Sequence, residues 1–181
     1  MKDLLLVIDM QNVYAEGGEW CCPKAAEAAT NIKSLLKDKR NDEVIFTKFV
    51  SPKNPEGTWK EYNRINREVN EDEYANEIMD VFLEDIKKYP VYEKSTYSSG
   101  TVRPVLEAAK KADRVILTGV VAECCVLATA FTFIDEGIDI IYLSDAVAGI
   151  DEKTEDSVIK VLEGLTYAQV KIMTTKEYLS L

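Results

Sequence analysis

A cysteine near the start of a predicted helix is the first group in this sequence that could perform covalent chemistry. Residues 114–119 form an apolar run that reads as a strand and ends at Gly119. An alanine-rich helical pattern follows within a few residues, with Cys125 in its opening turn. A thiol there feels the positive end of the helix dipole and lies near free backbone N–H groups, which favours both a thiolate and an oxyanion. From this stretch alone, the alternative is that Cys125 is a small buried hydrophobic residue, as most free cysteines are.

Two charged residues at the ends of other predicted strands add to this set of reactive groups. Asp9 follows residues 4–8, a continuous apolar run typical of a strand buried on both faces, and Lys94 follows a short strand predicted at 91–93. A carboxylate at the end of a buried strand is costly unless it is solvated, paired or useful. A catalytic pair is one interpretation of Asp9 and Lys94, and an inert salt bridge is the other.

The elements that must position these residues alternate between strands and helices. The sequence pattern also predicts strands at 43–50, 138–143 and 170–173. Helices are predicted at 23–36, from a Thr101 cap to about 111, from Cys125 to about 136, at 153–164 and from a capping box at 174–177. The stretch at 74–88 is expected to be partly helical, and residues 51–72 form an irregular polar segment. This alternation predicts an α/β fold with three αβα layers, formed by one domain over residues 1–181. Its sheet is expected to be doubly wound, six-stranded and mostly parallel, with strand order 3-2-1-4-5-6. Ligands bind such sheets beyond the carboxyl ends of the strands at the switch point, so Asp9, Lys94 and Cys125 are expected to converge on one crevice.

Charge and hydropathy exclude several classes of function. The formal net charge of −10 argues against nucleic acid and anionic membrane surfaces as partners, because both require basic patches. No apolar run approaches the ~20 residues that a membrane-spanning helix needs. The first apolar stretch is interrupted by Asp9 too early for a signal peptide, so we expect a cytoplasmic protein.

The histidine and cysteine contents restrict the chemistry further. The chain contains no histidine, which excludes Ser-His-Asp and Cys-His catalytic sites and a His-ligated zinc ion. The four cysteines form two adjacent pairs without the CxxC spacing of a metal or dithiol site. Packing roles are therefore expected for Cys21, Cys22 and Cys124, with Cys124 pointing away from Cys125.

Three segments and a later dipeptide together resemble the isochorismatase-like cysteine hydrolases, the superfamily that includes nicotinamidases and N-carbamoylsarcosine amidase. Residues 9–14 resemble the opening D-x-Q-N-D-F of that family, 94–99 resemble its K-x-x-Y-S-A, and 119–126 resemble its G-V-A-T-D-x-C-V. Asp145 and Ala146 match a later D-A. Each motif is loose by itself, but their order and spread over nearly the whole chain make the combination specific.

The resemblance implies a catalytic triad of Cys125, Asp9 and Lys94. Cys125 would attack an amide-type carbonyl, and Asp9 would take its proton and pass it to the leaving amine. Lys94 would lower the thiol pKa and keep Asp9 charged. The resemblance also implies a cis peptide bond before Val121, with the backbone N–H groups of Val121 and Cys125 as the oxyanion hole.

Departures from the family pattern concern the metal and the pocket. Nicotinamidases hold a metal through an Asp and histidines after the second strand, but residues 46–52 contain no histidine, so no metal and no cofactor are expected. Val13, Tyr14 and Gly100 replace the family's usual acid and two phenylalanines. Tyr14, Trp59, Tyr62 and Tyr97 are candidates to line the pocket, although buried aromatic residues more often serve packing.

These observations favour a metal-independent cysteine hydrolase that cleaves a small amide, ureide or N-carbamoyl compound through a thioacyl-enzyme at Cys125. The alternative is a non-catalytic or thiol-sensing homologue that acts as an oligomeric partner. Nicotinamidase activity is disfavoured by the missing histidines, and hydrolysis of a vinyl ether is disfavoured because that branch of the family dispenses with the cysteine. Arg64 and Arg67 could indicate an anionic substrate, but solvated surface charge is the stronger interpretation. A homo-oligomer is expected by analogy alone.

Overall fold

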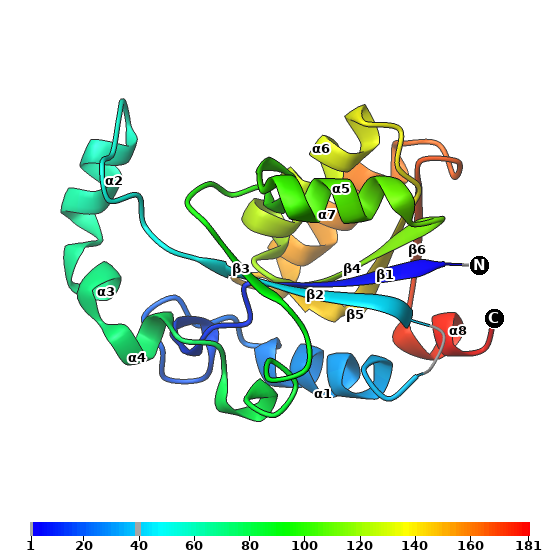
Figure 1. The fold of residues 1–181 in the computed structure, drawn as a ribbon, viewed down its shortest axis with the longest axis horizontal. Coiled ribbons are helices and arrows are strands. Elements are labelled where there is room, and N and C mark those ends of the chain that lie inside the picture. The colour runs from blue at the N-terminus through cyan, green and yellow to red at the C-terminus, as the bar shows by residue number, and fades with distance from the viewer. Residues whose placement is uncertain (1, 39–40) are drawn as a thin grey trace.

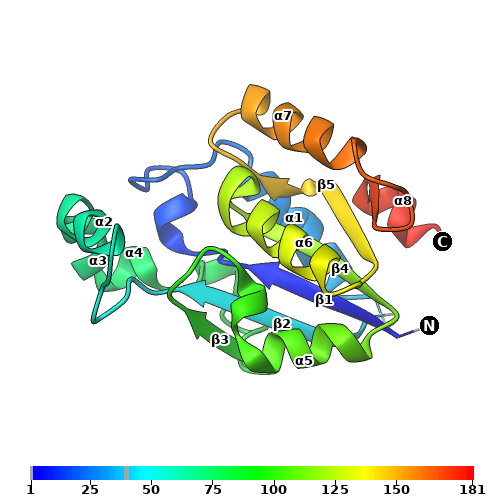
Figure 2. The ribbon, with the colours of Figure 1, turned by 90° about the horizontal axis from the view of Figure 1, so that it is seen from above.

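Six parallel strands form the centre of the computed structural model, which describes residues 2–38 and 41–181. The strands are β1 (Asp3–Ile8), β2 (Asn41–Phe49), β3 (Val91–Lys94), β4 (Arg114–Val120), β5 (Ile140–Ala148) and β6 (Val170–Met173). They lie in the order β3-β2-β1-β4-β5-β6, and every neighbouring pair is parallel (Figures 1 and 2). The predicted α/β class and strand order are confirmed, and the sheet is wholly rather than mostly parallel.

Helices cover both faces of the sheet and bury the apolar strands between two layers. One layer contains α1 (Ala25–Leu35) and α8 (Thr175–Leu179), and the other contains α5 (Arg103–Lys111), α6 (Leu127–Asp135) and α7 (Glu152–Glu163) (Figure 1). Successive side chains of β1 point to opposite faces: Leu5 and Val7 pack with the α1 layer, and Leu4, Leu6 and Ile8 with the other. The continuous apolar run at 4–8 therefore reflects burial on both faces.

A helical arm lies beyond the carboxyl edge of the sheet, and its first two helices fall in the segment 51–72, for which the sequence predicts an irregular course. It consists of α2 (Trp59–Ile65), α3 (Arg67–Glu71) and α4 (Glu73–Asn76), and it projects at the left of Figure 1. Local interactions stabilise these short helices: Glu61 pairs with Arg64, Arg67 pairs with Glu71, and Asp72 caps α4. None of the three helices contains a fully buried residue, so no apolar periodicity marks them in the sequence.

Gln11 ties this arm to the edge of the sheet. Its side-chain amide donates hydrogen bonds to the carbonyl oxygens of Phe49 (3.0 Å) and Asn76 (2.7 Å), and its carbonyl oxygen accepts one from the N–H of Phe49 (2.8 Å). Gln11 is 1% exposed, so these bonds satisfy a buried amide while they fix the end of α4 against β2.

Several element boundaries differ from the predicted ones. Helix α1 begins at Ala25, two residues after Pro23, and Thr101 belongs to a 3₁₀ turn at Ser99–Thr101 instead of capping α5. Strand β5 continues to Ala148, because a register shift lets its last residues pair with the end of β4. The stretch at 74–88 is helical in part, as predicted, through α4 and a 3₁₀ turn at Asp80–Phe82.

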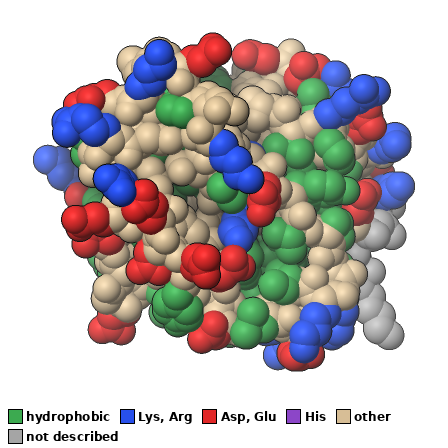
Figure 3. All heavy atoms as spheres, turned by 60° about the vertical axis from the view of Figure 1, so that its left-hand side comes forward, with side chains coloured by type: hydrophobic (Ala, Val, Ile, Leu, Met, Phe, Trp, Pro, Cys, Tyr) green, Lys and Arg blue, Asp and Glu red, His purple; other side chains and the backbone are tan. Residues whose placement is uncertain are grey.

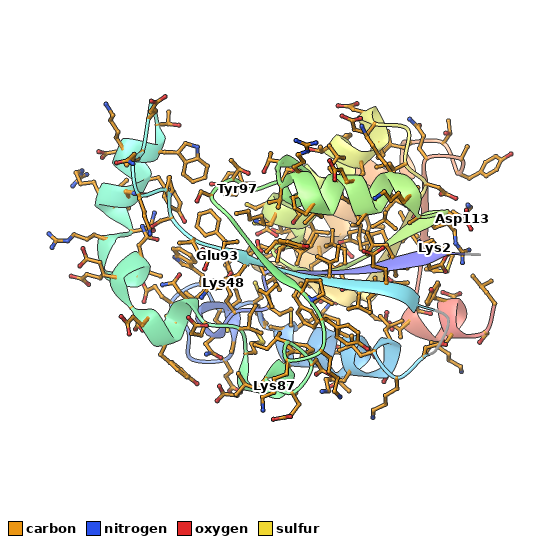
Figure 4. All side chains as sticks on the ribbon, viewed as in Figure 1. Lys2, Lys48, Lys87, Glu93, Tyr97 and Asp113 are labelled. Carbon is orange, nitrogen blue, oxygen red and sulfur yellow. The ribbon has the colours of Figure 1, made fainter. Side chains whose placement is uncertain are left out.

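The predicted capping box at the start of α8 is present, with reciprocal hydrogen bonds between Thr174 and Glu177. At the opposite edge from the arm, the N–H of Lys2 donates to Asp113 (2.7 Å; Figure 4). None of the helices in the described part of the chain reaches the length and hydrophobicity that crossing a bilayer requires.

Candidate active site

Three reactive side chains meet at the carboxyl edge of the sheet, near its switch point. The ammonium nitrogen of Lys94 lies 2.6 Å from Oδ2 of Asp9 and 3.5 Å from the sulfur of Cys125. Asp9 follows β1, Lys94 is the last residue of β3, and Cys125 follows β4. Asp9 is fully buried, and Lys94 and Cys125 are each 3% exposed. The topology thus brings together three groups from distant parts of the sequence.

The backbone and one threonine position the carboxylate of Asp9. Asp9 has φ of 50°, a left-handed conformation that non-glycine residues adopt rarely and that aspartate tolerates better than most. Its N–H donates to the carbonyl oxygen of Thr47 (3.1 Å), and the Thr47 hydroxyl donates to Oδ1 (2.8 Å). Within the described residues, Oδ2 accepts no hydrogen bond of good geometry, and its contact with Lys94 is an ion pair.

The ammonium of Lys94 is held by the loop that follows its own strand. Its nitrogen donates to the carbonyl oxygens of Thr96 (3.0 Å) and Tyr97 (2.9 Å), and it lies 5.4 Å from the centre of the Phe49 ring. Two carbonyl acceptors and a carboxylate stabilise the charged form in a position with no contact to water. The same bonds fix the backbone from which Tyr97 projects (Figure 4).

Cys125 lies in a π-helical turn, Ala122–Val126, that precedes α6. The sequence pattern predicts the opening turn of an α-helix at this position; a helical start is present, but its backbone hydrogen bonds follow the wider π-helical pattern. Such π turns occur often at functional sites. The peptide bond between Val120 and Val121 is cis. The Thr129 hydroxyl accepts a hydrogen bond from the N–H of Ser99 (2.9 Å) and donates one to the carbonyl oxygen of Cys125 (2.7 Å).

Burial determines the resting protonation state of the thiol. Burial raises the pKa of Cys125 well above its ordinary value, and the negative charge of Asp9 raises it further. The positive charge of Lys94 opposes both effects without outweighing them. Lys94 thus lowers the thiol pKa, as expected, but its effect is smaller than those of burial and Asp9. The net direction is upward, so the expected preference for a thiolate is wrong.

A cavity of about 270 Å³ opens above Cys125. Its walls are formed by Tyr14, Glu19, Trp20, Cys22, Tyr62, Asn66, Tyr97, Val121, Cys124, Cys125 and Ile150. Three of the aromatic candidates, Tyr14, Tyr62 and Tyr97, belong to this wall. Trp59 does not: its ring packs behind the wall, 5.0 Å from the ring of Tyr62 and 5.4 Å from that of Tyr97.

Several wall residues were missed or misplaced by sequence analysis. Cys124 was expected to point elsewhere and Cys22 to serve packing alone, yet both line the cavity beside Cys125. Trp20 was not recognised as a candidate, because its position depends on the tight loop around Gly18, whose backbone lies against Val13. The only sequence signal was the Gly17-Gly18 pair shortly before it.

The two arginines of the arm are surface residues. Arg64 is paired with Glu61 and Arg67 with Glu71, in each case within one helix and with both side chains mostly exposed. Neither arginine lines the cavity above Cys125. Among the described residues, no three acidic or cysteine side chains lie close enough together to hold a metal ion.

The sequence is similar to those of a known family, and the fold is similar to those of known proteins. The isochorismatase domain matches residues 3–177, and no curated protein matches the sequence. The fold is similar to that of a cysteine hydrolase from Pseudomonas syringae pv. phaseolicola, with a TM-score of 0.82, 20% identity and coverage of 99% of this chain and 91% of that one. An isochorismatase-like hydrolase from Alkaliphilus metalliredigens gives a TM-score of 0.78 at 20% identity, covering 99% and 98%. N-carbamoylsarcosine amidase from Thermoplasma acidophilum gives 0.73 at 24% identity, covering 97% of both chains.

Proposed function

The chain belongs to the isochorismatase family, with the fold of the isochorismatase-like hydrolases, and on that premise we propose that it cleaves a small amide, ureide or N-carbamoyl compound. The observation that supports this most is the buried contact of Lys94 with both Asp9 and Cys125 beneath a cavity of small-molecule size. A nucleophile, a base and a fixed cation at one point are the groups that acyl transfer requires.

In the acylation half, the sulfur of Cys125 attacks the carbonyl carbon, and the thiol proton moves to Oδ2 of Asp9. Val121 and Cys125 both line the cavity, and their backbone N–H groups would hold the developing oxyanion. The carbon–nitrogen bond then breaks, Asp9 returns its proton to the leaving nitrogen, and ammonia or an amine departs from a thioester at Cys125.

In the deacylation half, a water molecule gives one proton to Asp9 and attacks the thioester carbon. The carbon–sulfur bond breaks, the acid product leaves, and Asp9 returns the proton to the sulfur. Lys94 keeps its proton throughout: it holds the Asp9 carboxylate in its charged form and stabilises negative charge as this forms on sulfur.

The metal of the nicotinamidase branch does not fit the residues of this chain. Residues 46–52, which form the end of β2 and the first residues after it, contain no histidine. Lys48 within them pairs with Glu77 (2.7 Å) and lies beside Glu93 of β3 (Figure 4). No step of the proposed reaction goes through a metal, and a nicotinamidase activity has no support from this region.

The test is a panel of small amides, ureides and N-carbamoyl compounds assayed for ammonia release. The wild-type protein should turn over at least one class and accumulate a thioester that intact-protein mass spectrometry detects after rapid acid quench. Cys125→Ala should show neither, whereas Cys21→Ala, which removes a thiol that does not line the cavity, should retain both. Turnover that survives in Cys125→Ala would contradict the proposal.

A thiol-sensing role is the second candidate, and the three cysteines around one cavity favour it. In that case mild peroxide would oxidise Cys125 to a sulfenic acid with release of water, reversibly under dithiothreitol, and no compound of the panel would be hydrolysed. Peptide-level mass spectrometry after peroxide, carried out beside the amide panel, distinguishes the two functions.

A further inference from the structure

We propose that the cavity above Cys125 selects substrates that carry a positive charge, such as an ammonium or quaternary ammonium group next to the scissile amide. This inference rests on the proposed hydrolase function, because it names the substrate class of the same site. It is carried by the aromatic walls of the cavity and by the sign of the charges around it.

Aromatic rings form a continuous wall on one side of the cavity. The rings of Tyr14 and Trp20 lie 5.9 Å apart between centres, and those of Trp20 and Tyr62 lie 6.5 Å apart. Trp59 supports the wall from behind, in contact with Tyr62 and Tyr97. Faces of tryptophan and tyrosine attract cations, and several such rings around one space form the cages that bind quaternary ammonium groups.

The charged side chains around the cavity also favour a cation. Glu19 lines the cavity and is exposed at its rim, and no lysine or arginine is among the described residues that line it. Lys94 lies below, but its charge is compensated by Asp9 at 2.6 Å. Glu123 lies behind the wall: burial raises the pKa of the lining thiols of Cys22 and Cys124, and the negative charge of Glu123 raises it further.

An anionic substrate would be repelled by the same negative charges. The arginines of the arm are already paired with acids of their own helices, and on the face where the arm comes forward acidic side chains alternate with basic ones (Figure 3). A carboxylate in the cavity would have Glu19 at the rim and Glu123 behind the wall, with no cation free to pair with it among the lining residues. The chain as a whole carries a net charge of −10, which also attracts cations.

Three amides test the charge preference, and the first two of them are matched in shape. Trimethylammonioacetamide, 3,3-dimethylbutanamide and malonamate present a cationic, a neutral and an anionic group at the same distance from the amide. We expect kcat/KM for the cationic amide to exceed that for the neutral isostere by about five- to thirtyfold, the range of a partly desolvated cation–π contact. Malonamate should be the poorest of the three. Equal values for the cationic and neutral amides, or a preference for malonamate, would overturn the inference.

Variants of the wall assign the preference to particular groups. Tyr62→Phe keeps the ring and should keep the ratio of cationic to neutral kcat/KM, whereas Tyr62→Leu should lower it towards one. Glu19→Gln should also lower the ratio, and Glu16→Gln, in the same loop but outside the cavity wall, is the matched control that should leave it unchanged. A ratio that is equal in all four variants would contradict the assigned site.

A binding measurement separates failure of this inference from failure of the proposed function. Tetramethylammonium chloride at millimolar concentration should slow the alkylation of Cys125 by iodoacetamide, whereas sodium chloride and tert-butanol at equal concentration should not. Protection without hydrolysis of any amide would refute the hydrolase and leave the cation site in place. Hydrolysis of amides without protection by tetramethylammonium would refute the cation site and leave the hydrolase in place.

Discussion

Replacing Asp9 by asparagine should separate the reactivity of the Cys125 thiol from catalysis. In the wild-type protein the carboxylate raises the pKa of the thiol, and in the proposed mechanism it is also the group that accepts the thiol proton during attack. Asp9→Asn removes the negative charge with little change of shape. We therefore expect the Cys125 thiol to react faster with an alkylating agent while hydrolysis is lost.

The magnitude follows from the position of Lys94. Its ammonium lies 3.5 Å from the sulfur, and at an effective dielectric constant of about 20 two unit charges at that distance attract by about 5 kcal/mol. Asp9 cancels part of this attraction in the wild-type protein. Release of only a third of it exceeds the ~1.4 kcal/mol that corresponds to a tenfold change. Alkylation of Cys125 at neutral pH should thus accelerate by about tenfold or more. Loss of the general base should lower kcat by about 10²- to 10⁴-fold.

The pH dependence of Cys125 alkylation shows in which direction Asp9 shifts the thiol pKa. Because the thiolate is the reactive form and burial raises the pKa of Cys125, the alkylation rate of the wild-type protein should still increase with pH well above neutrality. In Asp9→Asn the same increase should begin at a lower pH.

The assay is peptide-level mass spectrometry of iodoacetamide adducts over time at several pH values, with ammonia release measured in parallel. Asp3→Asn is the matched control, because Asp3 is a buried, ion-paired acid at the other end of the same strand. That variant should lose stability and leave the labelling rate of Cys125 unchanged. Labelling of Asp9→Asn no faster than wild type, or turnover within tenfold of wild type, would refute the assignment of Asp9 as the base.

Three further substitutions test the surroundings of this site. Lys94→Met leaves Asp9 buried and unpaired, so thermal or urea unfolding should show a loss of about 3–5 kcal/mol together with loss of turnover. Thr47→Val removes the hydroxyl that donates to Asp9 and should lower kcat about tenfold at nearly unchanged KM, with Thr47→Ser close to wild type. Gly119→Ala places a Cβ against the carbonyl oxygen of Ile8 at φ of 108°, so the unfolding free energy should fall by more than about 3 kcal/mol. Unchanged unfolding curves for Lys94→Met or Gly119→Ala, or unchanged kcat for Thr47→Val, would contradict these roles.

The sheet and the meeting of its reactive groups could be predicted because the relevant signals are local. Apolar runs such as 4–8 and 114–119 mark strands that are buried on both faces, and alternation with helical patterns leaves few possible topologies. Once the strand order is known, Asp9, Lys94 and Cys125 must lie at one edge. Their contact distances depend on side-chain packing and are not contained in the pattern.

The sequence predicts Tyr14, Tyr62 and Tyr97 as wall residues, but the other side of the cavity and the thiol pKa depend on contacts between distant segments and could not be predicted. Trp20 and Cys22 reach the cavity through a loop that folds back onto Val13 and Tyr14, with backbone bonds that no periodicity announces. Thr47 looks like an ordinary β-branched strand residue until the carboxylate of Asp9 is placed beside it. The rise in the pKa of Cys125 reflects burial, which a helix-dipole argument from sequence leaves out.

The balance of charges among Asp9, Lys94 and Cys125, the proposed triad, affects how the cavity above them can select a charged substrate. With a carboxylate, an ammonium and a neutral thiol, the three buried side chains carry no net charge, and moving the thiol proton to Asp9 leaves that sum unchanged. In a site of low dielectric constant, a change in the net charge costs far more free energy than the transfer of a proton between two groups of the site. The proton can therefore move between sulfur and carboxylate while Lys94 stays fixed, and the triad exerts little net field on the substrate. Preference for a charged substrate must then come from the walls, where Glu19 and the rings of Tyr14, Trp20 and Tyr62 favour a cation.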